Sequence, residues 1–246
     1  MFSESIVNIL VNHDFCSSRA ARNFLKKNQV FVNKERILDY KFPVKIESDE
    51  IIVNGKILEK GEHLYIVMNK PLGYVCSYTS DSHPLVYDLL SSVKVPAGLG
   101  KLHTVGRLDL DTSGLLLLTT NGTFSHKLAS PESHVKKTYR VFLEKALSKD
   151  EELFYQKAFE EGIFLPAEKK AGECRALPAE IEFLDEQNCV VTVCQGKFHQ
   201  VRRMFSALGN KVVKLERIQF GSLIMAEELK TGTYRFIGAS DVEKIL

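Results

Sequence analysis

A glycine-bounded loop that runs directly into an apolar strand is the feature that most constrains this chain. Residues 105–122 read VGRLDLDTSGLLLLTTNG. Leu115–Leu118 is too short to cross a membrane and predicts a buried strand, closed by a turn at Asn121-Gly122. The loop before it carries Asp109 and Asp111. The segment therefore predicts two carboxylates at the start of an interior strand.

These aspartates have three possible non-catalytic explanations. A calcium-binding EF-hand needs a glutamate at its twelfth position, where Thr120 stands after four leucines. A phosphate-binding loop needs glycine spacings that Gly106 and Gly114 do not supply. A structural turn, in which the carboxylates cap backbone amides, remains open for Asp109 and is favoured for Asp111.

A second segment, CQGKFHQVRRMFSALG at residues 194–209, predicts an amphipathic helix that ends at Gly209. The wheel places Arg202 beside the apolar stripe, where a guanidinium normally has a carboxylate partner. Arg203 lies nearly opposite the stripe and is expected to face solvent or phosphate. In a third segment, HVKKTYRVFL, Tyr139 begins a strand between cations, a pattern that also suits base stacking.

The first 60 residues form a separate small unit in this interpretation. Ser17 and Ser18 can cap a helix with a basic surface, and a strand at Val30–Val32 follows. Asn54-Gly55 is a strong two-residue hairpin signal. We expect one domain at residues 1–60 and a second at residues 61–246.

Charge is distributed unevenly, although Lys and Arg exceed Asp and Glu by only two in 246 residues. Residues 16–36 and 193–217 each carry six basic residues and one acid, whereas residues 144–186 carry twelve acids and six basic residues. We expect the two basic segments to contact nucleic acid and the acidic segment to matter little. Five scattered cysteines without a C-x-x-C pair predict a reducing, cytoplasmic setting without a structural metal.

Residues SRAARNFLKKNQVFVNKERI and VKIESDEIIVNGK resemble the S4 RNA-binding domain. In that family a basic helix pair and the adjoining hairpin loop contact structured RNA. The resemblance therefore implies RNA contacts at Arg19, Arg22, Lys26 and Lys27.

The remaining motifs resemble the pseudouridine synthases that modify small-subunit ribosomal RNA. They are NKPLGYVCS, GRLDLDTSGLLLLTTNG, KTYRV and QGKFHQVRRMFSALGNKVVKLERIQFG, in that order. The resemblance implies an α+β fold, in which the S4-like domain precedes a catalytic domain with a mixed, largely antiparallel sheet and a central cleft. It assigns the catalytic aspartate to Asp109 and substrate contacts to Tyr139, Arg202 and Arg107. Lys197 and Arg203 are expected to contact RNA.

The implied reaction isomerises a uridine of 16S rRNA without cofactor or metal. Asp109 would act at the sugar, and the flipped base would stack on Tyr139. The expected partner is 16S rRNA in a partly assembled subunit, bound by a monomer without membrane attachment. The alternatives are a 23S rRNA target, a non-catalytic rRNA-binding assembly factor and an unrelated aspartate-dependent hydrolase. His199 and the HPLVYDLL stretch at His83–Leu90 favour the small subunit.

Overall fold

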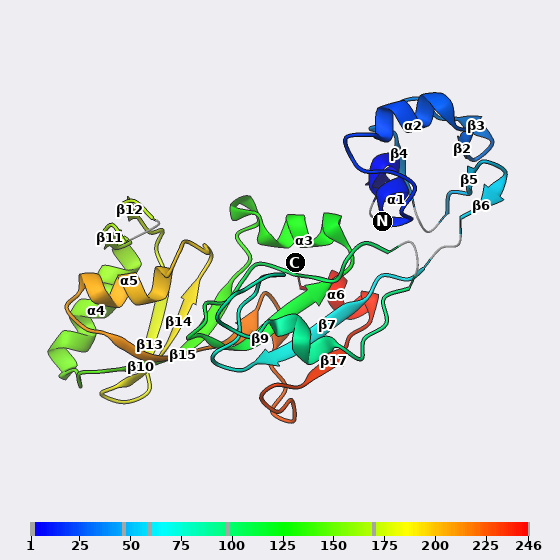
Figure 1. Cartoon of the computed structure of the whole chain (residues 1–246). Helices are drawn as coiled ribbons and strands as arrows, with labels where there is room; N and C mark the ends of the chain where they lie inside the picture. The colour runs from blue at the N-terminus through cyan, green and yellow to red at the C-terminus, as the bar shows by residue number, and fades with distance from the viewer. Residues whose placement is uncertain (1–2, 46–47, 59–60, 97–98, 169–170, 246) are drawn as a thin grey trace. The chain divides into compact units, whose positions relative to one another are not determined.

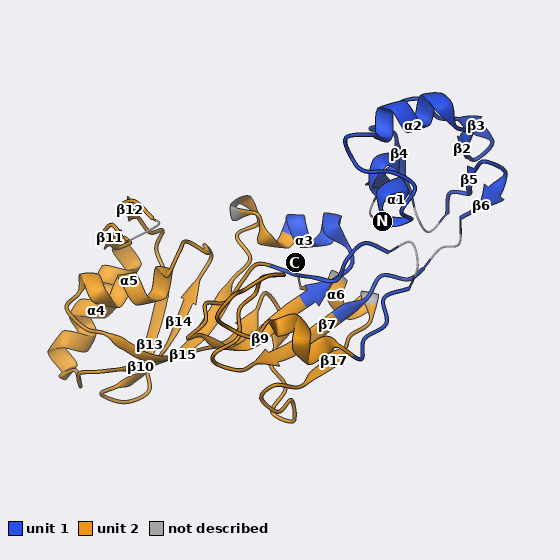
Figure 2. Ribbon diagram, viewed as in Figure 1, with its two compact units in different colours: residues 1–65, 92–105, 118–127 blue, residues 66–91, 106–117, 128–246 orange. Residues whose placement is uncertain are grey.

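The computed structural model describes residues 3–45, 48–58, 61–96, 99–168 and 171–245. These residues form two compact units, coloured in Figure 2. Unit 1 joins residues 1–65 to residues 92–105 and 118–127, and unit 2 contains residues 66–91, 106–117 and 128–246. The domain boundary predicted at residue 60 falls on residues 59–60, outside the described residues.

The described part of residues 3–58 in unit 1 contains two short helices and six short strands that pair antiparallel. Its β2, β3, β5 and β6 form a sheet in the order β3-β2-β5-β6, and β1 pairs with β4. Ile6, Leu10, Leu25 and Val30 are completely buried in the core of this region. In chain order the elements are β1 (Glu4–Ser5), α1 (Ile6–Asn12), α2 (Ala21–Lys27), β2 (Val30–Val32), β3 (Glu35–Arg36), β4 (Pro43–Val44), β5 (Ile51–Val53) and β6 (Lys56–Ile57), as Figure 1 shows.

The predicted hairpin between β5 and β6 is confirmed. Asn54 and Gly55 both have positive φ angles, 50° and 79°, as a type I′ turn requires. The predicted serine cap of α2 is wrong. The carbonyl of Ser17 accepts a hydrogen bond from the Ala20 amide in a turn, so the helix begins only after Ala20, whose side chain cannot cap it.

A mixed sheet with mostly antiparallel strands lies mainly in unit 2, which confirms the predicted α+β class. Its order is β13-β14-β10-β15-β9-β7-β17. The pair β15–β9 is parallel, whereas β13–β14, β14–β10, β10–β15 and β7–β17 are antiparallel. The strands are β7 (Tyr65–Lys70), β9 (Ser113–Thr119), β10 (Lys137–Leu143), β13 (Glu180–Phe183), β14 (Asn188–Val193), β15 (Val212–Phe220) and β17 (Tyr234–Phe236).

Shorter elements complete the chain. β8 pairs with the end of β9, β16 pairs with β15, and β11 pairs with β12. The remaining strands are β8 (His103–Thr104), β11 (Phe164–Leu165), β12 (Cys174–Arg175) and β16 (Leu223–Ile224). The helices are η1 (Val86–Leu90), α3 (Gly122–Ala129), η2 (Pro131–Ser133), α4 (Lys149–Glu161), α5 (Gln200–Ala207) and α6 (Ala239–Glu243). None of the described helices is long and apolar enough to span a bilayer.

Strand β9 is the buried strand that the leucine run predicts. Leu115–Leu118 are all 0% exposed. Gly114, near the start of this strand, has a φ of 101°, and a Cβ there would lie 2.3 Å from the carbonyl oxygen of Arg217. Only glycine permits β15 to approach so closely. This contact fixes the point at which the loop carrying Asp109 becomes a strand.

The turn predicted at Asn121-Gly122 is wrong, because helix α3 begins there. The Asn121 Oδ1 accepts a hydrogen bond from the Phe124 amide at 2.9 Å. An asparagine in this position serves equally as a turn residue and as a helix cap. The sequence pattern therefore could not separate the two.

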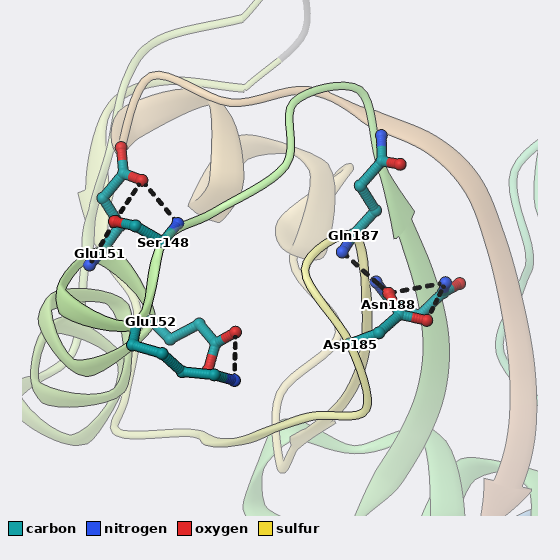
Figure 3. A network of polar contacts seen from close by, with 7 residues as sticks. Ser148, Glu151, Glu152, Asp185, Gln187 and Asn188 are labelled. Carbon is teal, nitrogen blue, oxygen red and sulfur yellow. Dashed lines mark hydrogen bonds and ion pairs between the residues drawn. The ribbon is translucent and has the colours of Figure 1, made fainter.

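Helices α4 and α5 pack against β10, β14 and β15 (Figure 1). Tyr155 and Phe159 of α4 meet Phe205 of α5 in a core that includes Val141 and Val191. Figure 3 shows the capping box that begins α4. Ser148 Oγ accepts from the Glu151 amide at 3.4 Å, and the Glu151 carboxylate accepts from the Ser148 amide at 2.8 Å.

Replacing Ser148 with alanine will lower the free energy of unfolding by about 1 kcal/mol, because the first turn of α4 loses its cap. A urea titration followed by circular dichroism measures this. Lys157→Ala is the control, since its ion pair with Glu161 is exposed and 4.0 Å long. It should change stability by less than about 0.5 kcal/mol. Equal losses in both variants would contradict the capping argument.

Candidate active site

A buried lysine fixes the loop that carries Asp109. Lys70, at the end of β7, is 0% exposed, and its ammonium donates to the carbonyls of Pro71, Asp109 and Thr112 at 3.1, 3.0 and 2.8 Å. The Thr112 amide also donates to the Asp109 carbonyl at 3.1 Å. One side chain therefore fixes the backbone at Asp109 and at Thr112, on either side of Asp111.

Sequence reasoning missed this role of Lys70. The stretch NKPLGYVCS was identified only as a family motif, without a role for its lysine. A signal was available, because a lysine that directly continues an apolar strand must either leave the core or find acceptors within it. Burial lowers the pKa of Lys70, and the nearby Cys76, Asp109 and Asp111 oppose that shift.

The Asp109 carboxylate faces α5 of the same unit. Its Oδ1 lies 3.8 Å from Nε2 of His199, the residue that caps α5, and the carboxylate is 37% exposed. Burial raises the pKa of Asp109 above its usual range, and Asp111 adds to this. His199, Arg202 and Lys70 act in the opposite direction, His199 most strongly. The site is a half-buried carboxylate beside an imidazole, with a guanidinium, an ammonium group and a second carboxylate nearby.

Arg202 does have the carboxylate partner that its place on the helix predicts, but that partner is Asp111. Its Nη2 lies 3.0 Å from the Asp111 Oδ2 and donates to the Asp111 carbonyl at 2.8 Å. Its Nη1 donates to the Val212 carbonyl at 2.9 Å. Arg202 thus joins α5 and β15 to the loop that carries Asp109 and reaches Asp109 only through its charge.

The prediction that Arg203 faces solvent is wrong. Arg203 is 4% exposed and donates to the carbonyls of Leu165, Pro166, Gly172 and Phe198. A helix wheel of α5 alone predicts that the face carrying Arg203 is exposed. In the structure the β11–β12 hairpin packs against α5 and covers this face. A guanidinium has five donors in a planar fork, and Nε, Nη1 and Nη2 of Arg203 all donate to these carbonyls. Arg217 is 2% exposed as well, so the second basic segment offers less surface charge than its composition suggests.

The other expected substrate residues occupy different places in unit 2. Tyr139 is half-buried in β10, packs against the core under α4 and α5, and pairs in register with Arg217. Arg217 in turn pairs with Gly114, five residues after Asp109. Arg107 is exposed at the start of the loop. Lys197 is half-buried, and its ammonium donates to the Arg175 carbonyl at 2.8 Å.

A cavity of about 480 Å³ opens beside α5. Its lining includes Asp111, Glu168, His199, Arg202, Ser206 and Lys211. The cavity therefore adjoins the side chains that face Asp109. Among the described residues, no group of three or more His, Cys, Asp or Glu side chains is arranged to hold a metal ion.

In unit 1, the four basic residues expected to contact RNA are exposed. They are Arg19, Arg22, Lys26 and Lys27. The guanidinium of Arg22 lies 4.1 Å from the ring centre of Tyr40. Such a cation–π contact orients the guanidinium without neutralising its charge.

Two consecutive parts of the chain match families of known proteins. Residues 64–207 match the family model of RNA pseudouridylate synthases, and residues 5–51 match that of the S4 domain. The small-subunit pseudouridine synthase A of Haemophilus influenzae is 38% identical over 92% of this chain and 92% of its own length. Its namesake from Escherichia coli K12 is 34% identical over 90% and 91% of the two chains.

A solved structure is similar as well. The crystal structure of a pseudouridylate synthase matches 98% of this chain and 99% of its own, with 36% identity and a TM-score of 0.66. The chain therefore belongs to the RNA pseudouridylate synthase family and carries an S4 domain at its N-terminal end.

Proposed function

We propose that this protein isomerises one uridine of 16S ribosomal RNA to pseudouridine, with Asp109 acting at the sugar. The observation that carries the assignment is the Asp109 carboxylate, half-buried next to His199 on a loop that Lys70 fixes. The small-subunit target is supported by the relatives from Haemophilus influenzae and Escherichia coli K12, which are named as small-subunit enzymes.

The chemistry needs only one ionised carboxylate. The N1–C1′ bond of the uridine breaks, the uracil turns, and C5 bonds to C1′. C5 then loses its proton and N1 gains one, so substrate and product have the same atoms. Asp109 either attacks C1′, as the nucleophile of a retaining glycosidase does, or removes a proton from the sugar. Neither route consumes a cofactor.

The remaining side chains can bind a base that has been flipped out of its helix. A uridine inside a stacked helix is out of reach of Asp109, so it must be extruded. The half-buried ring of Tyr139 can stack on the base, and its hydroxyl can assist proton loss from C5. The exposed Arg107 can fill the space that the base leaves, and Arg202 holds the loop by its pair with Asp111.

RNA binding is assigned to the exposed cations of the S4 domain, together with Lys197 and the cavity beside α5. Phosphate contacts of this kind supply affinity rather than sequence discrimination. The natural substrate is 16S rRNA in a partly assembled subunit, and the protein acts as a monomer in the cytoplasm. Its five cysteines are all free thiols, which fits a reducing compartment.

The test is a map of pseudouridines in both ribosomal RNAs, made by carbodiimide modification and primer extension from cells with and without the gene. We expect one site in 16S rRNA to disappear and to return when purified protein is added to the deficient RNA or subunit. Loss of a site only in 23S rRNA would overturn the target, and unchanged maps of both RNAs would overturn the activity.

A further inference from the structure

His199 lies between two carboxylates, and each of its ring nitrogens faces one of them. Its Nε2 is 3.8 Å from the Asp109 Oδ1, and its Nδ1 is 2.9 Å from the Glu168 Oε1. The backbone of His199 is left-handed, with φ 47°, and the ring stacks on Phe198 with the centroids 3.8 Å apart. This unusual backbone and the stacking leave the ring little freedom to turn away.

Glu168 is presented to His199 by a loop that α5 itself fixes. Arg203 donates to the Pro166 carbonyl at 2.7 Å and to the Gly172 carbonyl at 2.8 Å, on either side of Glu168. The buried arginine and the stacked histidine thus come from the same short helix and its cap. Glu168 belongs to the acidic segment at residues 144–186, for which we expected little effect on RNA binding. Its contact with His199 gives this one acid a specific role.

We propose that His199, oriented by Glu168, is a positioning residue that keeps the Asp109 carboxylate ionised and correctly aimed. The inference rests on the proposed function of Asp109. A protonated imidazole donates from both nitrogens and can serve both carboxylates at once, whereas a neutral ring donates from only one. When Glu168 accepts at Nδ1, the second proton of an imidazolium would lie on Nε2, the nitrogen that faces Asp109.

The other charged groups around Asp109 are already engaged. Lys70, from β7, is bonded to three carbonyls, and Arg202, from α5, is paired with Asp111 of the same loop. His199 faces only Asp109 and Glu168 among the charged groups whose ion pairs are described. Burial and Asp111 raise the pKa of Asp109, and His199 is the strongest of the groups that lower it. Removing His199 should therefore leave Asp109 protonated to a higher pH.

The first test is His199→Asn, because asparagine tolerates the left-handed backbone but cannot supply the charge. The matched control is His134→Asn, since His134 is exposed and has a similar φ of 49°. In single-turnover assays on a 16S fragment, we expect the His199 variant to lose between about 10-fold and 100-fold in rate. Its RNA affinity should stay within about twofold, and the acid limb of its pH–rate profile should move to higher pH. The control should behave as wild type.

The second test needs no RNA. Carbon-detected NMR of the Asp109 carboxyl, assigned with Asp109→Asn, should show protonation at higher pH in the His199 variant and no change in the His134 control. Glu168→Gln should lose part of the rate, while Glu180→Gln, whose carboxylate pairs with Lys136 at 2.7 Å, should not. An unchanged Asp109 titration together with a wild-type rate in His199→Asn would overturn the inference. A wild-type protein inactive on rRNA would refute the proposed function alone, because the titration would still decide the inference.

Discussion

Asp109→Asn will abolish pseudouridine formation, with a rate loss of at least about 10⁴-fold, because no other carboxylate occupies its position. RNA affinity should remain within about twofold, since the exposed cations of the S4 domain are untouched. Single-turnover assays and filter binding on the same 16S fragment measure the two quantities. Asp111→Asn is the matched control from the same loop. It loses its pair with Arg202 and the charge that helps to raise the pKa of Asp109, and should cost no more than about tenfold in rate.

The same variant should not be less stable than the wild type at neutral pH. Burial raises the pKa of Asp109, so the folded protein holds this proton to a higher pH than the unfolded chain does. The stability that the group contributes is complete below the unfolded pKa and is lost as the pH rises through the folded pKa. An asparagine at this position does not titrate, so its contribution to stability is not lost as the pH rises. Thermal unfolding at pH 7.5 should therefore give a midpoint at least as high as that of wild type. A variant that unfolds early, or one that keeps its activity, would contradict the assigned role.

The sequence predicted the parts of the site that local pattern controls. The leucine run predicted β9, and the spacing of Val201, Met204 and Phe205 predicted the buried face of α5. The first element is a continuous apolar run and the second carries an apolar stripe at helical spacing, and the Asp109 loop is tied to the start of β9. The position of Arg202 beside the apolar stripe also predicted a carboxylate partner, although not which of two nearby aspartates it would be.

The remainder depended on contacts between segments distant in the chain. Arg203 is buried because the β11–β12 hairpin, whose Pro166 and Gly172 lie 37 and 31 residues upstream, covers its helix face. A helix wheel of α5 alone cannot show that contact. The link from Glu168 through His199 to Asp109 joins three segments whose spacing carries no common motif. Lys70 is a buried cation whose hydrogen bonds, among the residues that the structure describes, go to the backbone carbonyls of Pro71, Asp109 and Thr112. Backbone acceptors leave no trace in residue identity.

Lys70→Met will damage both the stability and the activity of the protein, although methionine fills a similar volume. The substitution leaves the carbonyls of Pro71, Asp109 and Thr112 buried without their donor. Each unsatisfied buried carbonyl costs about 1–3 kcal/mol, and the relief of burying one charge less offsets part of the sum. We expect the free energy of unfolding to fall by about 2–4 kcal/mol. The loop that aims Asp109 should also relax, and a displacement of about 1 Å lowers the rate by about 100-fold.

Urea unfolding and single-turnover rates, both measured where the variant is still fully folded, separate the two effects. Lys214→Met is the control, because Lys214 is an exposed lysine on β15 and its loss should change stability by less than about 0.5 kcal/mol. A Lys70 variant that is less stable but turns over at the wild-type rate would mean that the lysine supports the fold without aiming Asp109. The rate loss at full folding is the decisive quantity, because it alone connects the buried end of β7 to the carboxylate.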